Sequence, residues 1–217
     1  MKKNLLILIV IFGYFFLYSD TGSLQIARLK YDGGGDWYND PDVIPNITKF
    51  FNSNVSSIFK TDEAVVTLRD TTLIDYPILY MTGHGNVVFS DFELQILRNY
   101  LLSGGFIYID DDYGMDNSIR QLLSKLFSDR PLVRIFSDYK IFTSFYNFDY
   151  LPKIHEHDDK QPEMWGIFIG ERLALVYTYE SNISDGWAGE NVHGNPPEVR
   201  EEALKFGVNI LYYALTQ

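Results

Sequence analysis

Cysteine is absent from the 217 residues of the chain, which excludes a disulfide framework and the attachment point of a lipoprotein. Positive charge is also scarce, because 18 Lys and Arg residues face 29 Asp and Glu residues and leave a net charge of −11. Such an acidic surface repels phosphate backbones, and no basic stripe interleaved with aromatic residues is present. We therefore expect no nucleic-acid partner.

Long hydrophobic runs are rare as well. The longest, LLILIVIFGYFFLY, spans 14 residues (5–18), follows Lys2 and Lys3, and precedes the polar stretch SDTGS. The run is short for a transmembrane helix and has the layout of a secretory signal, although no Ala-x-Ala cleavage site follows it. We predict that residues 1–19 form a signal peptide or an N-terminal anchor. The protein is then exported, either periplasmic or anchored facing the periplasm, and its lack of disulfides fits a bacterial envelope.

The remaining chain has the composition of a folded domain, with 46% hydrophobic and 16% aromatic residues. We expect residues 20–217 to form a single domain. Apolar runs predict strands at 24–31, 64–68, 77–83, 106–109 and 132–136, and a hairpin that turns at Gly170–Glu171. Helical spacing and end signals predict helices at 43–51, 90–103, 117–127 and 197–215. This alternation predicts an α/β fold with a doubly wound, mainly parallel sheet and helices on both faces.

Polar residues gather where the predicted strands end. The first strand runs into YDGGGDWYND, the third into GHGN, the fourth into DDDYG and the last into SNISDGW. Because ligands of open parallel sheets bind beyond the carboxyl ends of the strands, we predict a site for a small molecule or a glycan there. The candidate ligand-binding residues are Asp32, Asp36, Trp37, His84, Asp110, Asp111, Asp112, Asp185 and Trp187.

Histidines at the same edge make a divalent metal a possible cofactor. His155 and His157 point the same way if their segment is extended, which suits metal ligation. A simpler interpretation stays open, in which Asp112 caps the next helix while Asp110 and Asp111 are solvated. Because side chains alternate along a strand, the three aspartates do not all face one way if extended. The metal candidates are Asp111, His155, His157 and His193, and the catalytic candidates are Asp110, Asp111 and His84.

Long motifs connect the chain to a known family: ARLKYDGGGDWYNDP, YMTGHGNVVFSDFELQILRNYLLSGGFIYIDDDYGMD, LPKIHEHDD, and SDGW with EVREEALKFGVNILYYAL. Through them the chain resembles domain-of-unknown-function family 4159, which implies no established activity. The order of strand, capped helix, Gly-Gly and second strand resembles, more distantly, the class I glutamine amidotransferase-like superfamily, which implies a flavodoxin-like fold. That superfamily carries a cysteine nucleophile after the second strand, where this chain has Asp110 to Asp112. A cysteine-dependent amidotransferase is therefore excluded.

Three functions stay open. Aspartates are poor nucleophiles for amides but good metal ligands, general bases and acceptors for sugar hydroxyls. We favour an exported ligand-binding or degenerate-enzyme module with its Asp/His-rich site at the carboxyl ends of the strands. The alternatives are a metal-assisted hydrolase of a glycan or peptide bond, and a scaffold partner in an envelope complex.

Overall fold

The computed structural model describes residues 24–155 and 157–217. The predicted signal or anchor, residues 1–19, lies outside the described residues. Within them, none of the helices combines the length and the apolar character that crossing a bilayer requires.

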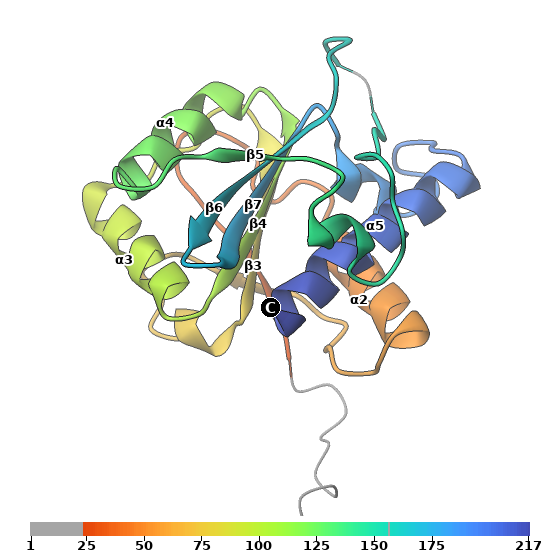
Figure 1. Cartoon of the computed structure of the whole chain (residues 1–217), viewed down its shortest axis with the longest axis horizontal. Coiled ribbons are helices and arrows are strands. Elements are labelled where there is room, and N and C mark those ends of the chain that lie inside the picture. Colours follow the sequence, from red (N-terminus) through yellow and green to blue (C-terminus); the bar gives the residue numbers. More distant parts are fainter. Residues whose placement is uncertain (1–23, 156) are drawn as a thin grey trace, which may run out of the picture.

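A seven-stranded sheet forms the centre of the fold, in the order β2-β1-β3-β4-β7-β6-β5 (Figure 1). Neighbouring strands from β2 to β7 pair in parallel, whereas β6 pairs antiparallel with both β7 and β5. The predicted hairpin at Gly170–Glu171 joins β6 to β7. The strand bounds are β1 Ile26–Leu29, β2 Ala64–Val66, β3 Ile78–His84, β4 Phe106–Tyr113, β5 Val133–Ile135, β6 Glu163–Ile169 and β7 Arg172–Tyr179.

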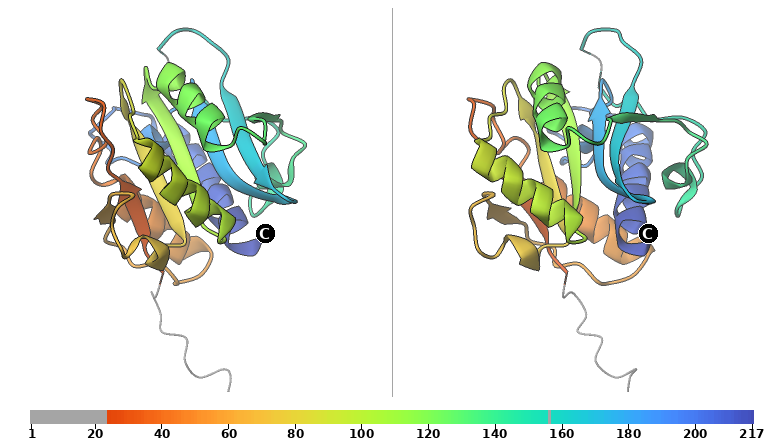
Figure 2. Two further views of the ribbon diagram at one scale, coloured as in Figure 1. Left: turned by 90° about the vertical axis from the view of Figure 1, so that its left-hand side faces the viewer. Right: turned by 60° about the vertical axis from the view of Figure 1, so that its left-hand side comes forward.

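Helices cover both faces of the sheet. Figure 2 shows α3 (Asp91–Leu102) and α4 (Asp116–Leu126) on one face, and α2 (Val43–Asn54) and α5 (Pro197–Thr216) on the other. Successive strand residues alternate between two buried clusters, so that Tyr108 packs with α2 and α5 while Ile107 packs with α3 and α4. Three short 3-10 helices complete the described part: η1 Leu73–Asp75, η2 Lys140–Thr143 and η3 Ile183–Gly186. The predicted α/β class and mainly parallel sheet are confirmed.

The segment that joins β3 to β4 follows its sequence signals closely. Ser90 caps α3 through the predicted capping box, in which the Ser90 hydroxyl and the Glu93 carboxylate each bond the other residue's backbone N–H. Gly104, with φ of +109°, then turns the chain into β4. This helical crossover is why β3 and β4 are parallel neighbours whose carboxyl ends meet at one edge of the sheet.

One strand is longer than predicted, and the difference is central to the site. The apolar pattern predicts that β4 ends at Ile109, but the strand continues to Tyr113. Hydrogen-bonding partners on both sides explain the extension, since Asp110 lies opposite Thr82 of β3 and Thr178 of β7. The three aspartates are therefore part of the sheet, and their side chains are buried.

A buried arginine fixes the loop that follows β1. Arg28 is only 1% exposed, lies 5.3 Å from the Tyr80 ring centroid, and forms an ion pair with Glu63 at 3.0 Å. Its guanidinium also donates to the backbone carbonyls of Trp37, Asn39 and Asp40 at 3.3, 2.7 and 2.9 Å. One strand side chain thus holds three backbone carbonyls of the loop at the edge of the sheet.

We predict that Arg28→Met lowers the free energy of unfolding by about 2–4 kcal/mol, because the loop carbonyls lose their donor and Glu63 loses its partner. Arg69→Met is the matched control, since Arg69 is largely exposed, forms an ion pair with Glu93 at 2.9 Å and lies 5.8 Å from the Phe92 ring centroid. We expect the control to cost less than about 1 kcal/mol. Urea denaturation of both variants measures the difference, and equal losses would contradict the anchoring role of Arg28.

Candidate functional site

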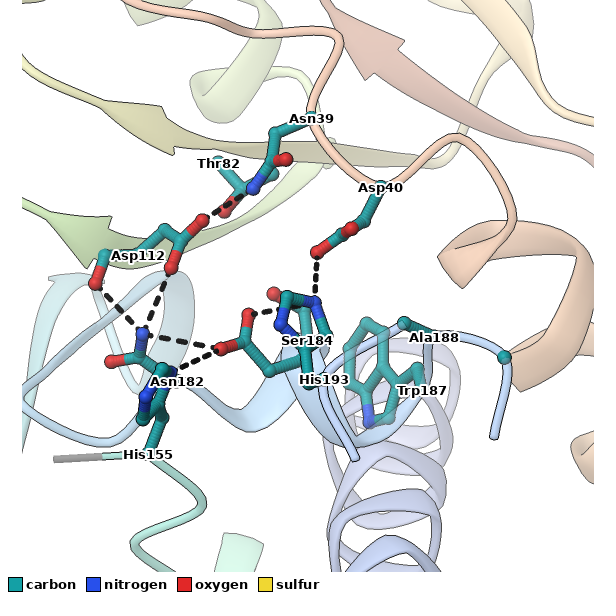
Figure 3. A network of polar contacts seen from close by, with 12 residues as sticks. Asn39, Asp40, Thr82, Asp112, His155, Asn182, Ser184, Trp187, Ala188 and His193 are labelled. Atoms are coloured by element: carbon teal, nitrogen blue, oxygen red, sulfur yellow. Dashed lines mark hydrogen bonds and ion pairs between the residues drawn. The ribbon is translucent and has the colours of Figure 1, made fainter. Parts of the chain in front are cut away.

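The carboxyl ends of β3, β4 and β7 and the loop after β1 converge at one edge of the sheet. Parallel strands place these ends together, so residues far apart in the sequence become neighbours. The segment after β7 turns back over this edge and forms η3. Figure 3 shows the resulting network, in which Asp112 of β4 faces Asn39 and Asn182 while His193 contacts Asp40.

The three aspartates of β4 point in two directions. Asp110 accepts hydrogen bonds from the Ser184 backbone N–H and hydroxyl, both at 2.7 Å, and so ties β4 to η3. Asp111 points to the opposite face, where it accepts from the Met115 N–H at 2.9 Å and the Tyr177 hydroxyl at 3.2 Å. The interpretation of Asp110 and Asp111 as solvated is wrong, because both are at most 2% exposed. The residue that bonds the backbone just before α4 is Asp111, which corrects the cap predicted for Asp112.

Burial makes these carboxyls hard to ionise. Desolvation raises the pKa of Asp110 to about 6, although bonds from Thr178 and Ser184 partly offset it. Desolvation likewise raises the pKa of Asp111 to about 7. The pKa of Asp112 is raised by desolvation even though the nearby His84 lowers it. The edge therefore holds more carboxyl groups than its surroundings stabilise in the charged form.

Asp112 joins a chain of polar side chains that reaches the surface. It accepts from Asn182 Nδ2 at 2.9 Å and from Asn39 Nδ2, and lies 3.3 Å from His84 Nε2. The other ring nitrogen of His84 lies 3.1 Å from Asp36, whose carboxylate also accepts from the His84 backbone N–H. Asp36 thus orients a half-exposed imidazole toward Asp112.

The densest group, which we call the acid–histidine cluster, consists of Asp40, Asp112, Asp185, His155 and His193. Asp185 lies 3.3 Å from His155 Nδ1 and 3.9 Å from His193 Nε2. His193 Nε2 lies 2.7 Å from Asp40. Desolvation, followed by the charges of Asp112, Asp110 and Asp40, raises the pKa of Asp185 to about 9. Desolvation also lowers the pKa of His155, so burial disfavours charge on both partners.

Two triplets in this cluster bring their ligand atoms within 4.8 Å of one another. One is His155, Asp185 and His193, and the other is Asp40, Asp112 and Asp185. Asp185 belongs to both. The predicted metal candidates His155 and His193 are thus brought together, and His157 lies beside them, with its ring centroid 4.6 Å from that of His155 and 4.5 Å from that of Tyr113. Asp111, by contrast, points to the opposite face of the sheet.

Some predicted ligand residues lie elsewhere. Trp187 is a core residue, 2% exposed, with its ring centroid 5.9 Å from that of Tyr80 and its Nε1–H bonded to the Ala203 carbonyl. It is therefore not available to stack on a sugar, which corrects its predicted role. Asp32 is exposed, and its carbonyl accepts from the Val88 N–H. Trp37 is half-buried, with Lys30 Nζ 5.3 Å from its ring centroid.

Sequence reasoning missed Asp40, Glu180 and Asn182. All three have a left-handed backbone, with φ of 48°, 55° and 51°. Such a conformation costs about 1 kcal/mol or more in a residue with a side chain, and it is concentrated at functional sites. Two of these positions have a signal in the sequence: Asp40 in the tripeptide NDP (39–41) and Asn182 in the tripeptide ESN (180–182). Asp and Asn tolerate the left-handed region better than most residue types do.

Comparisons with known proteins identify a family but no activity. A family model described as "Domain of unknown function (DUF4159)" matches residues 25–215 of the chain. The matched region includes every strand of the described sheet and all residues of the acid–histidine cluster. The search of curated proteins found no match.

The raised pKa of Asp111 predicts a pH dependence of stability. A carboxyl whose folded pKa is raised stabilises the fold while it is protonated, and this stability is lost as pH rises from about 4 through about 7. Asn at position 111 still accepts from Met115 and can donate to Tyr177. We therefore predict that Asp111→Asn removes this loss and adds roughly 1–3 kcal/mol above about pH 8 in chelator-treated protein.

Denaturation curves at several pH values test this prediction, with Asp70→Asn as a control of opposite sign. Hydrogen bonds from Thr67 lower the pKa of the exposed Asp70, so its contribution is lost as pH falls. The control should thus destabilise the protein at neutral pH. A wild type and an Asp111→Asn variant with parallel pH profiles would contradict the prediction.

Proposed function

Because the chain belongs to the family described as domain of unknown function DUF4159, which names no activity, we propose a function from the site itself. The protein is a ligand-binding module, or an enzyme that has lost its activity, built around a divalent metal in the acid–histidine cluster. One observation carries this proposal. In the described part of the chain, every ion pair of Asp40, Asp112 and Asp185 is made with a histidine.

Charge balance favours a bound cation. An imidazole does not supply the permanent positive charge of a lysine or an arginine, so sharing of protons or binding of a metal is needed to balance three close carboxylates at this edge. Asp112 and Asp185 are at most 4% exposed, which removes the water that would otherwise screen their repulsion. A divalent ion bound between the three carboxylates attracts all of them and so offsets their mutual repulsion.

The donor set suits a transition metal such as Zn²⁺. Imidazole nitrogens and carboxylate oxygens bind Zn²⁺ at about 2.0–2.2 Å, which places ligand atoms of a tetrahedral site about 3.4 Å apart. The atoms of His155, Asp185 and His193 all lie within 4.8 Å of one another, so rotamer adjustments are enough to close the site. The His155 side chain is 50% exposed, which leaves an approach for a ligand from solvent.

The order of the strands supports a doubly wound, flavodoxin-like sheet as part of the same proposal. The parallel strands follow the order β2-β1-β3-β4-β7, in which the chain moves outward on both sides of β1. This arrangement agrees with a distant relation to class I glutamine amidotransferases whose cysteine is missing. The basic and apolar segment at the start of the sequence supports export, and with it a glycan or an envelope protein as partner.

The pair of Asp36 and His84 favours a second candidate, a metal-assisted hydrolase of a glycan or peptide bond. A carboxylate that orients one nitrogen of an imidazole fixes the tautomer through which the other nitrogen moves a proton, as a general base requires. His84 Nε2 faces Asp112, a member of the metal cluster, at 3.3 Å. In a hydrolase, His84→Gln abolishes turnover and preserves metal binding, whereas in a binding module it leaves ligand affinity almost unchanged.

Metal titration tests the proposed site. We expect chelator-stripped protein without a histidine tag to bind Zn²⁺ in calorimetry and to gain melting temperature on binding. Asp185→Asn removes a charge and keeps the shape of the residue. The predicted result is a more stable metal-free protein whose affinity for Zn²⁺ is about 100-fold weaker, because a shared ligand is lost.

Asp111→Asn serves as the matched control, since it makes the same change in β4 on the opposite face of the sheet. We expect the control to bind Zn²⁺ as the wild type does. If melting curves of the wild type with and without Zn²⁺, Mn²⁺ and Ca²⁺ coincide, the metal proposal fails and a scaffold role in an envelope complex becomes the better explanation.

A further inference from the structure

The two triplets of the acid–histidine cluster are neighbours without being a single site. Their ligand atoms form two groups, each within 4.8 Å, that share Asp185, rather than one group of five residues. Ligand atoms of one ion lie about 2.1 Å from it, and so at most about 4.2 Å apart even on opposite sides of it. In the described conformation one ion therefore fits one triplet and not the five residues together.

The two triplets offer different ligand atoms. His155, Asp185 and His193, which we call the first position, present two imidazole nitrogens and a carboxylate, a donor set that suits Zn²⁺. Asp40, Asp112 and Asp185, which we call the second position, present carboxylate oxygens alone. Such a donor set favours harder cations such as Mg²⁺ and Mn²⁺. The cluster thus combines two kinds of cation ligand side by side.

One hydrogen bond connects the two positions. The nitrogen of His193 that faces Asp185, Nε2 at 3.9 Å, is the same nitrogen that lies 2.7 Å from Asp40 Oδ2. Figure 3 shows His193 and Asp40 facing each other across this contact. Among the described residues, the imidazole of His193 is the hydrogen-bond partner of the Asp40 carboxylate.

An ion in the first position breaks this bond. A nitrogen that ligates a metal has no hydrogen left to donate, so His193 Nε2 no longer serves Asp40. The side chain of Asp40 is 10% exposed and that of Asp112 is 4% exposed, which leaves little water to replace the lost donor. Binding of the first ion therefore releases a carboxylate oxygen at the second position, where it is available to a second cation.

The charges favour the same outcome. One divalent ion carries two positive charges, whereas Asp40, Asp112 and Asp185 carry three negative charges when they are ionised. One negative charge then stays uncompensated in surroundings that are largely dry, where charges interact strongly. A second divalent ion removes this excess. It has an approach from solvent beside His84, whose side chain is 46% exposed and whose Nε2 lies 3.3 Å from Asp112 Oδ2.

We propose that the acid–histidine cluster binds two divalent cations, first Zn²⁺ in the first position and then a harder ion such as Mn²⁺ or Mg²⁺ in the second. Asp185 is the carboxylate that they share. A carboxylate has two oxygens and bridges two ions readily, and the ions of such paired sites lie about 3.5–4 Å apart. The inference rests on the proposed metal site and adds to it a second ion, whose binding depends on the first.

Electron paramagnetic resonance of Mn²⁺ tests the second position, because the sharp signal of free Mn²⁺ is lost on binding. We expect the full chain, stripped with chelator and loaded with Zn²⁺, to bind about one Mn²⁺ per chain. Zn²⁺ keeps the first position in this titration, since it binds nitrogen ligands more tightly than Mn²⁺ does. Metal analysis of the same samples checks that the Zn²⁺ content stays constant.

Asp40→Asn acts on the second position alone. Asn still accepts from His193 and tolerates the left-handed backbone at this residue, where φ is 48°. We expect this variant to bind Mn²⁺ at least about tenfold more weakly and to bind Zn²⁺ as the wild type does. Asp32→Asn is the matched control, because Asp32 is an exposed residue of the same loop and belongs to neither triplet. The control should bind both ions normally.

His155→Gln provides a second test, at a half-exposed side chain of the first position. We expect it to weaken the binding of both ions, since the second ion depends on the first. Mn²⁺ that binds this variant as tightly as it binds the zinc-loaded wild type overturns that dependence.

The outcomes separate the inference from the proposed function. Zinc-loaded protein that leaves Mn²⁺ free overturns the second position and leaves the first one standing, as does Mn²⁺ that binds only by displacing Zn²⁺. Protein that binds neither ion overturns both proposals. Normal Mn²⁺ binding to Asp40→Asn shows that the ion lies elsewhere, which also overturns the inference.

Discussion

Repulsion between carboxylates that water does not reach is the constraint on which this edge of the molecule depends. Asp110 and Asp112 lie within β4, and Asp185 lies in η3 directly over it. Their neighbours are hydroxyls, amides and imidazoles, which bond carboxylates without supplying a permanent positive charge. Because such groups compensate burial only in part, the edge is stable with protons or with a cation and strained without them. That strain distinguishes this edge of the sheet from an ordinary solvated loop.

The alternation of side chains along β4 divides the three aspartates between two tasks. Asp111 faces α4 and bonds the Met115 backbone N–H, so it positions the start of that helix. Asp110 and Asp112 face the opposite side, where the segment after β7 folds over them. A single strand therefore anchors a helix on one face and supplies carboxylates to the cluster on the other. Successive side chains of a strand alternate between the two faces of the sheet, and this alternation determines the role of each aspartate.

Local signals in the sequence were enough for the α/β class, the capping box at Ser90, the hairpin at Gly170–Glu171 and the neighbouring ends of β3 and β4. Each of these depends on residues close together in the chain or on a rule of strand connection. The extension of β4 was not predictable, because it depends on hydrogen bonds to strands on both sides. The burial of Trp187 and the positions of Asp40 and Asn182 depend on contacts between distant segments, which no local pattern contains.

The electrostatics of the cluster fix the orientation of the Asn182 amide. Its amide nitrogen has two hydrogens, and acceptors from Asp112 and His157 surround it within 3.0 Å. With more acceptors than donors on the cluster side, the amide has one favourable orientation. The same orientation leaves its oxygen buried without a donor among the described residues. An excess of acceptors on one side of the amide therefore leaves an unsatisfied acceptor on the other side, which is a cost that the fold bears at this edge of the sheet.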